Sequence, residues 1–318
     1  MNAMKMRVHL SGLVIVSVFF ITTSCQRSRD NLDETPTRGN IRIAADESFK
    51  PLIDTQVQTF MSLYAYAVIT PRYLPEADVI ADLLNDSVRA IVVTRDLTQE
   101  ERDRLLAGQV VARTTKIAYD AVALILHQDN PDDQIRYDQV AGIMDGSIRN
   151  WNQLNPKSSL GDIVVVFDNR KSGNFRLLQE RFLKDKPLPS SLYAVNSNPE
   201  VLEYVRNNRN AIGVIGVNWI SDRDDTTSNN FLKDIRIAAI GREGDTEGEG
   251  DFIRPYQWYI AESSYPFKRE VYAICRESFT GLGTGFVQFV AGDVGQRMVL
   301  KSGLVPATMP VRLVQFKQ

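Results

Sequence analysis

The sequence predicts an α/β fold with largely parallel sheets, arranged in two lobes. Short apolar runs alternate along the chain with longer segments of helical periodicity, the pattern of strands joined by crossover helices. The chain has 318 residues, and domains of about 100–200 residues are usual, so the length favours two lobes. Hydroxyl residues precede several of the helical segments, where they can cap a first turn.

The predicted strands are short apolar runs between polar segments. They cover residues 41–45, 90–94, 117–127, 163–167, 211–215, 235–240, 257–261 and 270–275. The run that ends at Cys275 makes this cysteine a small buried side chain of the core.

The predicted helices fill several of the gaps between these strands. They cover residues 49–64, 99–107, 137–144, 174–183, 199–207 and 283–302. Thr98 and Glu101 have the spacing of a capping box at the start of the second helix. Ser48 and Ser172 stand between a strand and a helix, where an N-cap is expected.

The N-terminal segment has the pattern of an export signal. Lys5 and Arg7 precede an apolar run at residues 10–21, which is shorter than the roughly 20 residues of a membrane span but typical of a signal peptide. The small residues that lead to Cys25 resemble a bacterial lipobox, which implies a signal peptide at residues 1–24 and a lipid on Cys25. A plain secretory signal with an incidental cysteine is the alternative. Residues 25–39 are polar and predict a flexible, lipidated tether.

The composition excludes several classes of function. Two His and two Cys leave little room for a metal centre, a disulfide framework or a Ser-His-Asp triad. A net charge of −2, which becomes −4 when Lys5 and Arg7 leave with the signal, gives no basic surface for nucleic acid. We therefore expect no enzyme activity, no metal, no cofactor and no nucleic-acid partner.

Three junctions between a strand and the next helix could bind an anion. They lie at residues 46–49, 94–96 and 169–174, and in a parallel sheet such junctions gather at the carboxyl ends of the strands. The hydroxyls of Ser48 and Ser172, the amides around Gly173 and the guanidinium of Arg95 would form an oxyanion site. The alternative is that both serines are only helix caps.

Several stretches in order along residues 40–310 resemble one family. Residues 143–151 (IMDGSIRNW) are similar to the motif Ile-Phe-x-Gly-x-Ile-Thr-Asn-Trp of the phosphate-type (PstS-like) periplasmic substrate-binding proteins of ABC importers. The other matching stretches are residues 41–52, 93–98, 117–123 and 289–306.

The resemblance implies a type II periplasmic-binding fold, with two α/β lobes and a hinge. The first lobe would comprise residues 40–122 and 262–318, and the second residues 123–261. The protein would be an exported, membrane-anchored, monomeric lipoprotein facing the periplasm or the cell exterior. It would capture an oxyanion, phosphate first, for a membrane permease. The implied ligand-binding residues are Ser48, Phe49, Arg95, Ser172, Gly173 and Asn174, with Asp168 and Arg170 as further candidates. A non-transport ligand sensor or a surface-assembly lipoprotein is the alternative.

The binding loops depart from the family. Asn174 replaces a threonine, Asp168 stands at an arginine position, and Asp46 and Glu47 stand where small residues are usual. Residues 73–78, comparable to the family's second loop, contain no Gly or Ser. Unpaired carboxylates would repel an anion at low dielectric. Either nearby cations compensate for them, or they point away, or the ligand is not phosphate.

Overall fold

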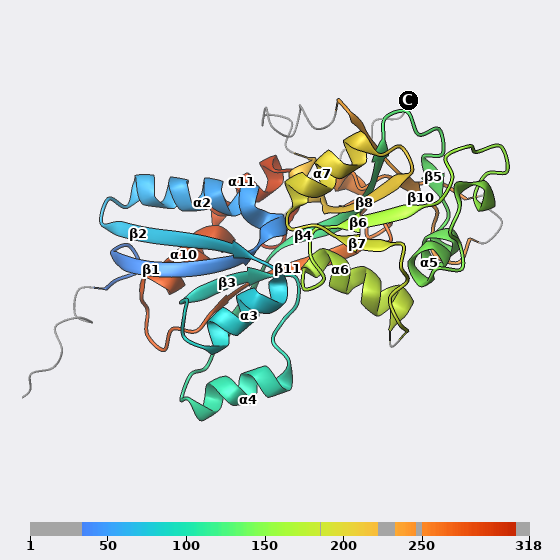
Figure 1. Cartoon of the computed structure of the whole chain (residues 1–318). Helices are drawn as coiled ribbons and strands as arrows, with labels where there is room; N and C mark the ends of the chain where they lie inside the picture. The colour runs from blue at the N-terminus through green and yellow to red at the C-terminus, as the bar shows by residue number, and fades with distance from the viewer. Residues whose placement is uncertain (1–33, 185, 222–232, 246–249, 310–318) are drawn as a thin grey trace, which may run out of the picture. The chain divides into compact units, whose positions relative to one another are not determined.

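Figure 1 shows the computed structural model, which describes residues 34–184, 186–221, 233–245 and 250–309. From Thr35 onward the chain is one compact unit. Within the described residues, no helix is long and apolar enough to cross a membrane. The proposed signal peptide and Cys25 lie outside these residues, so both stay predictions.

A mixed sheet of ten strands contains most of the extended segments, and its main path has the order β2–β1–β3–β11–β4–β8–β6–β7. Strands β9 and β12 also pair with β4, while β5 and β10 form a separate small sheet. The strands are β1 (Gly39–Asp46), β2 (Ala67–Leu74), β3 (Ala90–Val93), β4 (Arg113–His127), β5 (Gln134–Ile135), β6 (Val164–Phe167), β7 (Leu192–Ala194), β8 (Ala211–Gly216), β9 (Ile235–Ile237), β10 (Ala239–Ile240), β11 (Lys268–Cys275) and β12 (Val305–Pro306).

The strand directions confirm part of the expectation of parallel sheets. Strand β1 is parallel to β2 and β3, and β6 is parallel to β7 and β8. The centre of the sheet is antiparallel, because β4 pairs with both β11 and β8 in opposite directions. The expectation of parallel sheets therefore holds for the strands on either side of this centre but not for the centre itself.

Strand β4 changes its partner half-way along its length. Up to Ala121 it pairs with β11, and from Val122 onward it pairs with β8. This change lies beside the lobe boundary expected at residues 122 and 123, although the division into two lobes itself stays a prediction. One continuous strand therefore links both halves of the sheet.

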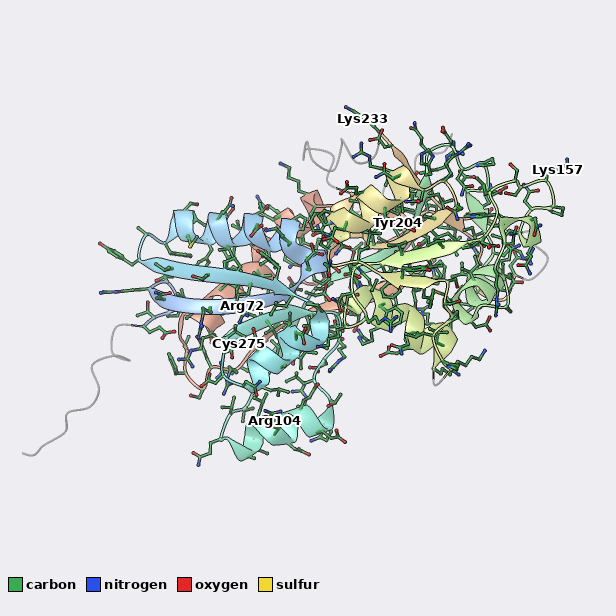
Figure 2. The ribbon with its side chains drawn as sticks, viewed as in Figure 1. Arg72, Arg104, Lys157, Tyr204, Lys233 and Cys275 are labelled. Carbon is green, nitrogen blue, oxygen red and sulfur yellow. The ribbon has the colours of Figure 1, made fainter. Side chains whose placement is uncertain are left out.

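Helices cover both faces of the sheet, as the alternation of side chains along β1 requires. Ile43 and Ala45 belong to the apolar cluster that includes α2 (Lys50–Leu63) and α10 (Leu282–Ala291), whereas Ala44 packs with α3 (Glu76–Leu84). Figure 1 shows α2 and α3 on opposite sides of the β1–β3 strands. Cys275, at the end of β11, is buried as expected (Figure 2).

Most of the predicted helices are confirmed. They are α2, α4 (Gln99–Ala107), α5 (Tyr137–Asp145), α6 (Gly173–Leu178), which a π-helical turn extends to Leu183, and α7 (Asn198–Asn207). The capping box is present, with the Glu101 N–H donating to Thr98 Oγ1 at 3.3 Å and the Thr98 N–H donating to Glu101 Oε2 at 2.8 Å.

Three element predictions are wrong. The single strand expected at residues 235–240 is divided into β9, which pairs with β4, and β10, which pairs with β5 in the small sheet. Residues 257–261 form helix α9 (Gln257–Ala261) and not a strand. The prediction fails here because periodicity cannot distinguish a strand from a helix in such a short apolar run. The helix expected at residues 283–302 is divided at Gly292 into α10 and α11 (Asp293–Lys301), since the backbone of Gly292 is extended. Strand β2 and helix α3 were not predicted.

Candidate functional site

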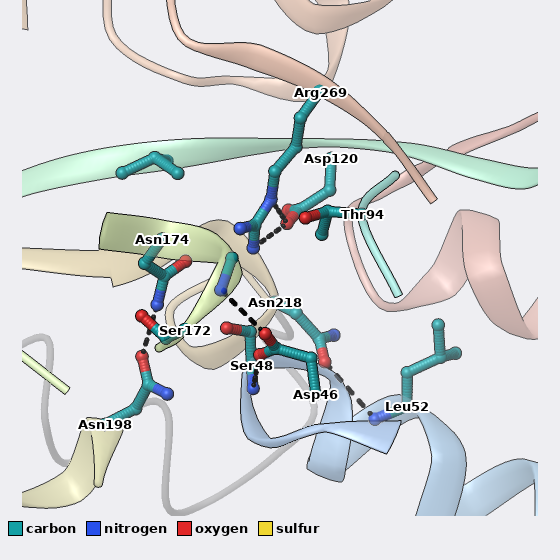
Figure 3. A network of polar contacts seen from close by, with 12 residues as sticks. Asp46, Ser48, Leu52, Thr94, Asp120, Ser172, Asn174, Asn198, Asn218 and Arg269 are labelled. Atoms are coloured by element: carbon teal, nitrogen blue, oxygen red, sulfur yellow. Dashed lines mark hydrogen bonds and ion pairs between the residues drawn. The ribbon is translucent and has the colours of Figure 1, made fainter. Parts of the chain in front are cut away.

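A buried polar cluster lies where the end of β1, the end of β3, the start of α6 and the start of β11 come together (Figure 3). Each of its side chains belongs to a residue that is at most 6% exposed. The cluster contains Asp46, Ser48, Thr94, Asp120, Asp168, Ser172, Asn174, Asn198, Asn218 and Arg269. Since burial of polar groups is costly without partners, the contacts of each one are informative.

Arg269 supplies the positive charge of the cluster. It stands opposite Asp120 on the neighbouring antiparallel strand, so both side chains point to the same face of the sheet. Its Nε and Nη2 donate to Asp120 Oδ2 at 2.8 and 2.7 Å. The guanidinium carbon also lies 5.3 Å from the ring centre of Phe49, a cation–π contact. Arg269 is therefore held in place from two sides.

Several polar atoms of the cluster have no partner among the described residues. They include Arg269 Nη1, Ser48 Oγ, Asn174 Oδ1 and Asp120 Oδ1. Three of the side chains converge above Gly216, because a Cβ built there would lie 3.1 Å from Arg269 Nη2, 3.2 Å from Ser48 Cβ and 3.6 Å from Asn174 Oδ1. The cluster thus offers the guanidinium of Arg269, the hydroxyl of Ser48, and two acceptor oxygens, Asn174 Oδ1 and Asp120 Oδ1. This combination suits a small oxyanion that also carries a proton.

Asp46 points into the cluster from the end of β1. Its Oδ1 accepts a hydrogen bond from the Ser48 N–H at 2.9 Å, and its Oδ2 accepts one from the Gly173 N–H at 2.8 Å. Burial and the nearby carboxylate of Glu76 raise the pKa of Asp46, while Arg269 acts in the opposite direction. Glu47 lies at the border of the cluster and accepts hydrogen bonds from the backbone and side-chain amides of Asn198.

Asp168 lies on the other side of the cluster, directly after β6. It accepts hydrogen bonds from Ser172 Oγ at 2.6 Å and Asn174 Nδ2 at 3.2 Å. Burial and the charge of Asp46 raise the pKa of Asp168 to about 7. This carboxyl group therefore carries a proton for part of the time near neutral pH.

A second ion pair borders the cluster at the start of α3. Glu76 accepts hydrogen bonds from the Thr94 N–H at 2.6 Å and from Arg176 Nε at 2.6 Å. Burial alone would raise the pKa of Glu76, but Arg176 and the Thr94 hydrogen bonds hold it below its usual value. Arg176 also donates to Thr94 Oγ1 at 2.9 Å. Glu76 is thus a paired, charged carboxylate.

The structure brings together most of the predicted site residues. Ser48, Phe49, Ser172, Gly173 and Asn174 lie in or against the cluster, and so does Asp168. Ser172 caps α6 as predicted, since its Oγ accepts from the Phe175 N–H at 3.2 Å. Capping and membership of the cluster are therefore compatible. The cap predicted at Ser48 is wrong: Asp46 caps the turn at Glu47–Phe49, and Phe49 stands at the N-cap of α2.

Two predicted residues lie away from the cluster. Arg95 pairs with Glu101, to whose carboxylate its Nη1 and Nη2 donate at 2.8 and 2.7 Å. Arg170 is exposed on the loop before α6. Of the alternatives left open for the carboxylates, compensation by Arg95 and Arg170 does not apply, because neither lies in the cluster. Arg269 pairs with Asp120 and Arg176 with Glu76. These four residues are not among the predicted site residues, whereas Thr94 belongs to a predicted junction. Within the described ranges, no group of three or more His, Cys, Asp or Glu could hold a metal ion.

Comparisons with known proteins give a consistent result. The family described as "PBP superfamily domain" matches residues 33–294. The phosphate-binding protein PstS of Borreliella burgdorferi is 22% identical over 302 residues, which cover 92% of this chain and 98% of the relative. PstS of Bacillus subtilis is 19% identical over 305 residues, covering 93% of each chain.

Solved structures have the same fold. One is a putative phosphate ABC transporter substrate-binding protein with bound phosphate from Clostridium perfringens, with a TM-score of 0.70, 23% identity, and coverage of 85% of this chain and 100% of the other. An ABC-type phosphate transport receptor from Vibrio cholerae has a TM-score of 0.61 at 19% identity, with coverage of 84% and 100%. At these identities, the likeness establishes the α/β fold of type II periplasmic-binding proteins.

Proposed function

The chain belongs to the PBP superfamily, and from this premise we propose that it is an extracytoplasmic solute-binding protein that captures phosphate for an ABC importer. The observation that carries the proposal is the buried guanidinium of Arg269. Its Nη1 has no hydrogen-bond partner among the described residues, and neither does the hydroxyl of Ser48, whose side chain lies with that of Arg269 above Gly216. The names of the PstS relatives support phosphate as the oxyanion.

The acceptors in the cluster favour a protonated oxyanion over a fully ionised one. Arg269 Nη1 and Ser48 Oγ can donate hydrogen bonds to anionic oxygens, whereas Asp120 Oδ1 and Asn174 Oδ1 can only accept them. Phosphate carries at least one hydroxyl at neutral pH and can satisfy both kinds of group. Sulfate carries none and would leave an acceptor unpaired at a cost of about 1–3 kcal/mol.

The position of the cluster suits capture between two lobes. Ser48, Asp120 and Arg269 come from the segments of the predicted first lobe, while Gly173 and Asn174 come from the predicted second lobe. A ligand in contact with both sets would hold the lobes together. Closure of this kind is how binding proteins present a ligand to a permease.

We further propose that the mature protein is a monomeric lipoprotein anchored through Cys25. The lipobox-like sequence before Cys25 and the polar residues 26–34 support a short tether. The tether is shorter than the predicted residues 25–39, because Thr35 pairs with Arg38 and β1 begins at Gly39. One observation favours the second candidate, a ligand sensor or surface-assembly lipoprotein: Asp46, which stands where the resembled family has a small residue, brings a carboxylate to the Gly173 N–H. Permease and ATPase genes beside the gene of this protein would favour transport.

Isothermal titration of phosphate into the chain from residue 26 onward tests the proposal. We expect heat of binding for the unaltered chain, much weaker binding for Arg269→Gln, and unchanged binding for the matched variant Arg95→Gln. Sulfate serves as the competing oxyanion. If phosphate gives no heat while another ligand binds, phosphate is the wrong ligand. If Arg269→Gln is folded and binds like the unaltered chain, the site is wrong.

A further inference from the structure

The carboxylate of Asp46 joins two parts of the chain that are far apart in sequence. One oxygen stays local and accepts from the Ser48 N–H, which makes Asp46 the cap of the turn at Glu47–Phe49. The other oxygen accepts from the Gly173 N–H, 127 residues away. A cap needs only one of the two oxygens. The second contact is therefore a tertiary feature that capping does not explain.

The second oxygen lies beside the groups that the proposed ligand would use. A Cβ on Gly173 would lie 3.1 Å from Asp46 Oδ2, so the carboxylate packs directly against the glycine backbone. The positive charge of Arg269 is close enough to lower the pKa of Asp46, against the opposite effect of burial. Meanwhile Arg269 Nη1 and Ser48 Oγ, both in residues that are at most 5% exposed, have no partner among the described residues. Figure 3 shows Asp46 and Ser48 next to each other, with the guanidinium of Arg269 above them in this view.

We propose that Asp46 is a built-in competitor of the anionic ligand: its carboxylate takes the N–H of Gly173 and part of the positive field of Arg269, and so sets the affinity of the site. This inference rests on the proposed function. A ligand anion must bind next to a like charge or displace it from Gly173, and either route weakens binding. The residue therefore determines both how tightly an oxyanion binds and how strongly a protonated one is preferred.

Two substitutions separate the charge of Asp46 from its hydrogen bond. Asp46→Asn removes the charge and keeps one acceptor oxygen, which can serve the Gly173 N–H at the expense of the Ser48 N–H. Asp46→Ser removes both the charge and the reach to Gly173. Phosphate and sulfate are titrated calorimetrically into the unaltered chain, these two variants and Asp293→Asn. Asp293 pairs with Arg297 on an exposed helix turn and provides the matched control. Circular dichroism and thermal melting show which variants are folded.

We expect the dissociation constant for phosphate to fall about tenfold or more in Asp46→Asn, and at least as far in Asp46→Ser, because a like charge is removed from a buried site. Asp293→Asn should leave it unchanged. The gain should be larger for sulfate than for phosphate, since sulfate has no proton to offer. If one variant fails to fold, the other still tests the proposal.

Two results overturn the inference in different ways. If the unaltered chain binds phosphate and the folded Asp46 variants bind it equally or more weakly, Asp46 is no competitor, and the proposed function stands. If neither the unaltered chain nor a folded variant binds any oxyanion, the proposed function fails and the inference fails with it.

Discussion

Arg269 and Asp120 face each other on neighbouring antiparallel strands, and two guanidinium nitrogens of Arg269 donate to a single carboxylate oxygen at 2.8 and 2.7 Å. Both side chains are almost fully buried. A buried pair of this kind adds little net stability, but the loss of one partner leaves an uncompensated charge inside the protein. The pair also leaves one atom of each residue, Arg269 Nη1 and Asp120 Oδ1, without a hydrogen-bond partner in the part of the chain that the structure describes, which makes it the centre of the proposed site.

The first prediction concerns this pair. Asp120→Asn should lower the free energy of unfolding by about 3 kcal/mol, because the charge of Arg269 would remain buried without its counterion. Urea denaturation followed by circular dichroism measures the change. Asp293→Asn, which breaks an exposed pair, should have no measurable effect. A loss in Asp120→Asn no larger than that of the control would contradict the prediction.

The position of the site could be predicted from sequence, but its positive charge could not. Ser48 and Ser172 each follow a strand and precede a helix, a local pattern that places them at the same edge of the sheet. Arg269 lies inside a strand, 149 residues from Asp120. Its role depends on which residue of β4 stands opposite it, and strand register is a tertiary property that no local pattern encodes.

The misplaced Arg95 has a different cause. The capping box places the Glu101 carboxylate at the start of α4, where it also reaches the guanidinium of Arg95. The same short motif that correctly predicted the helix thus removes this arginine from the site. The carboxylate of Glu101, six residues after Arg95, is the feature of the sequence that indicates this pairing. It is stronger evidence than the general tendency of strand-to-helix junctions to bind anions.

The second prediction concerns pH. Burial raises the pKa of Asp168 to about 7, whereas an aspartate in an unfolded chain titrates near about 3.9. Between these values the folded state holds a proton that the unfolded state has lost. The contribution of Asp168 to stability is therefore full below about pH 4 and is lost as the pH rises through 7, at up to about 1.4 kcal/mol per pH unit.

Asp168→Asn tests the direction of this dependence of stability on pH. The unaltered chain should lose stability between pH 5 and pH 7, and the variant should lose less, when urea midpoints are measured across that range. Asp46, Glu47 and Asp120 have raised pKa values and contribute with the same sign, while the lowered pKa of Glu76 contributes with the opposite one. Equal slopes for the two proteins would show that Asp168 does not hold the proton.

The third prediction separates helix capping from ligand binding at Ser172. Ser172→Ala removes the acceptor for the Phe175 N–H and the donor to Asp168, and should lower the free energy of unfolding by about 1 kcal/mol. Ser197 caps α7 and accepts from the Glu200 N–H at 3.4 Å. Ser197→Ala should therefore cost a similar free energy, yet only Ser172→Ala should weaken phosphate binding. Equal affinities in both variants would leave Ser172 as a cap alone.

The fourth prediction concerns Gly216, above which the side chains of Arg269, Ser48 and Asn174 converge. A methyl group there would lie 3.1 Å from Arg269 Nη2 and 3.2 Å from Ser48 Cβ, so it would occupy space next to the proposed ligand. Its φ of −69° is open to any residue, and Gly216→Ala therefore adds volume without backbone strain. We expect phosphate binding to weaken at least about tenfold, a change of roughly 1.4 kcal/mol.

Gly108→Ala is the matched control for this substitution. Gly108 also has an unstrained φ, −84°, and its added methyl would lie 3.3 Å from Leu105 O at the end of α4, away from the cluster. Both variants thus place a methyl group in a tight contact, but only one places it beside Arg269. Calorimetric titration should show the loss in Gly216→Ala alone. If Gly216→Ala binds phosphate as tightly as Gly108→Ala, the ligand does not occupy the space between Arg269, Ser48 and Asn174, and the site must be sought elsewhere.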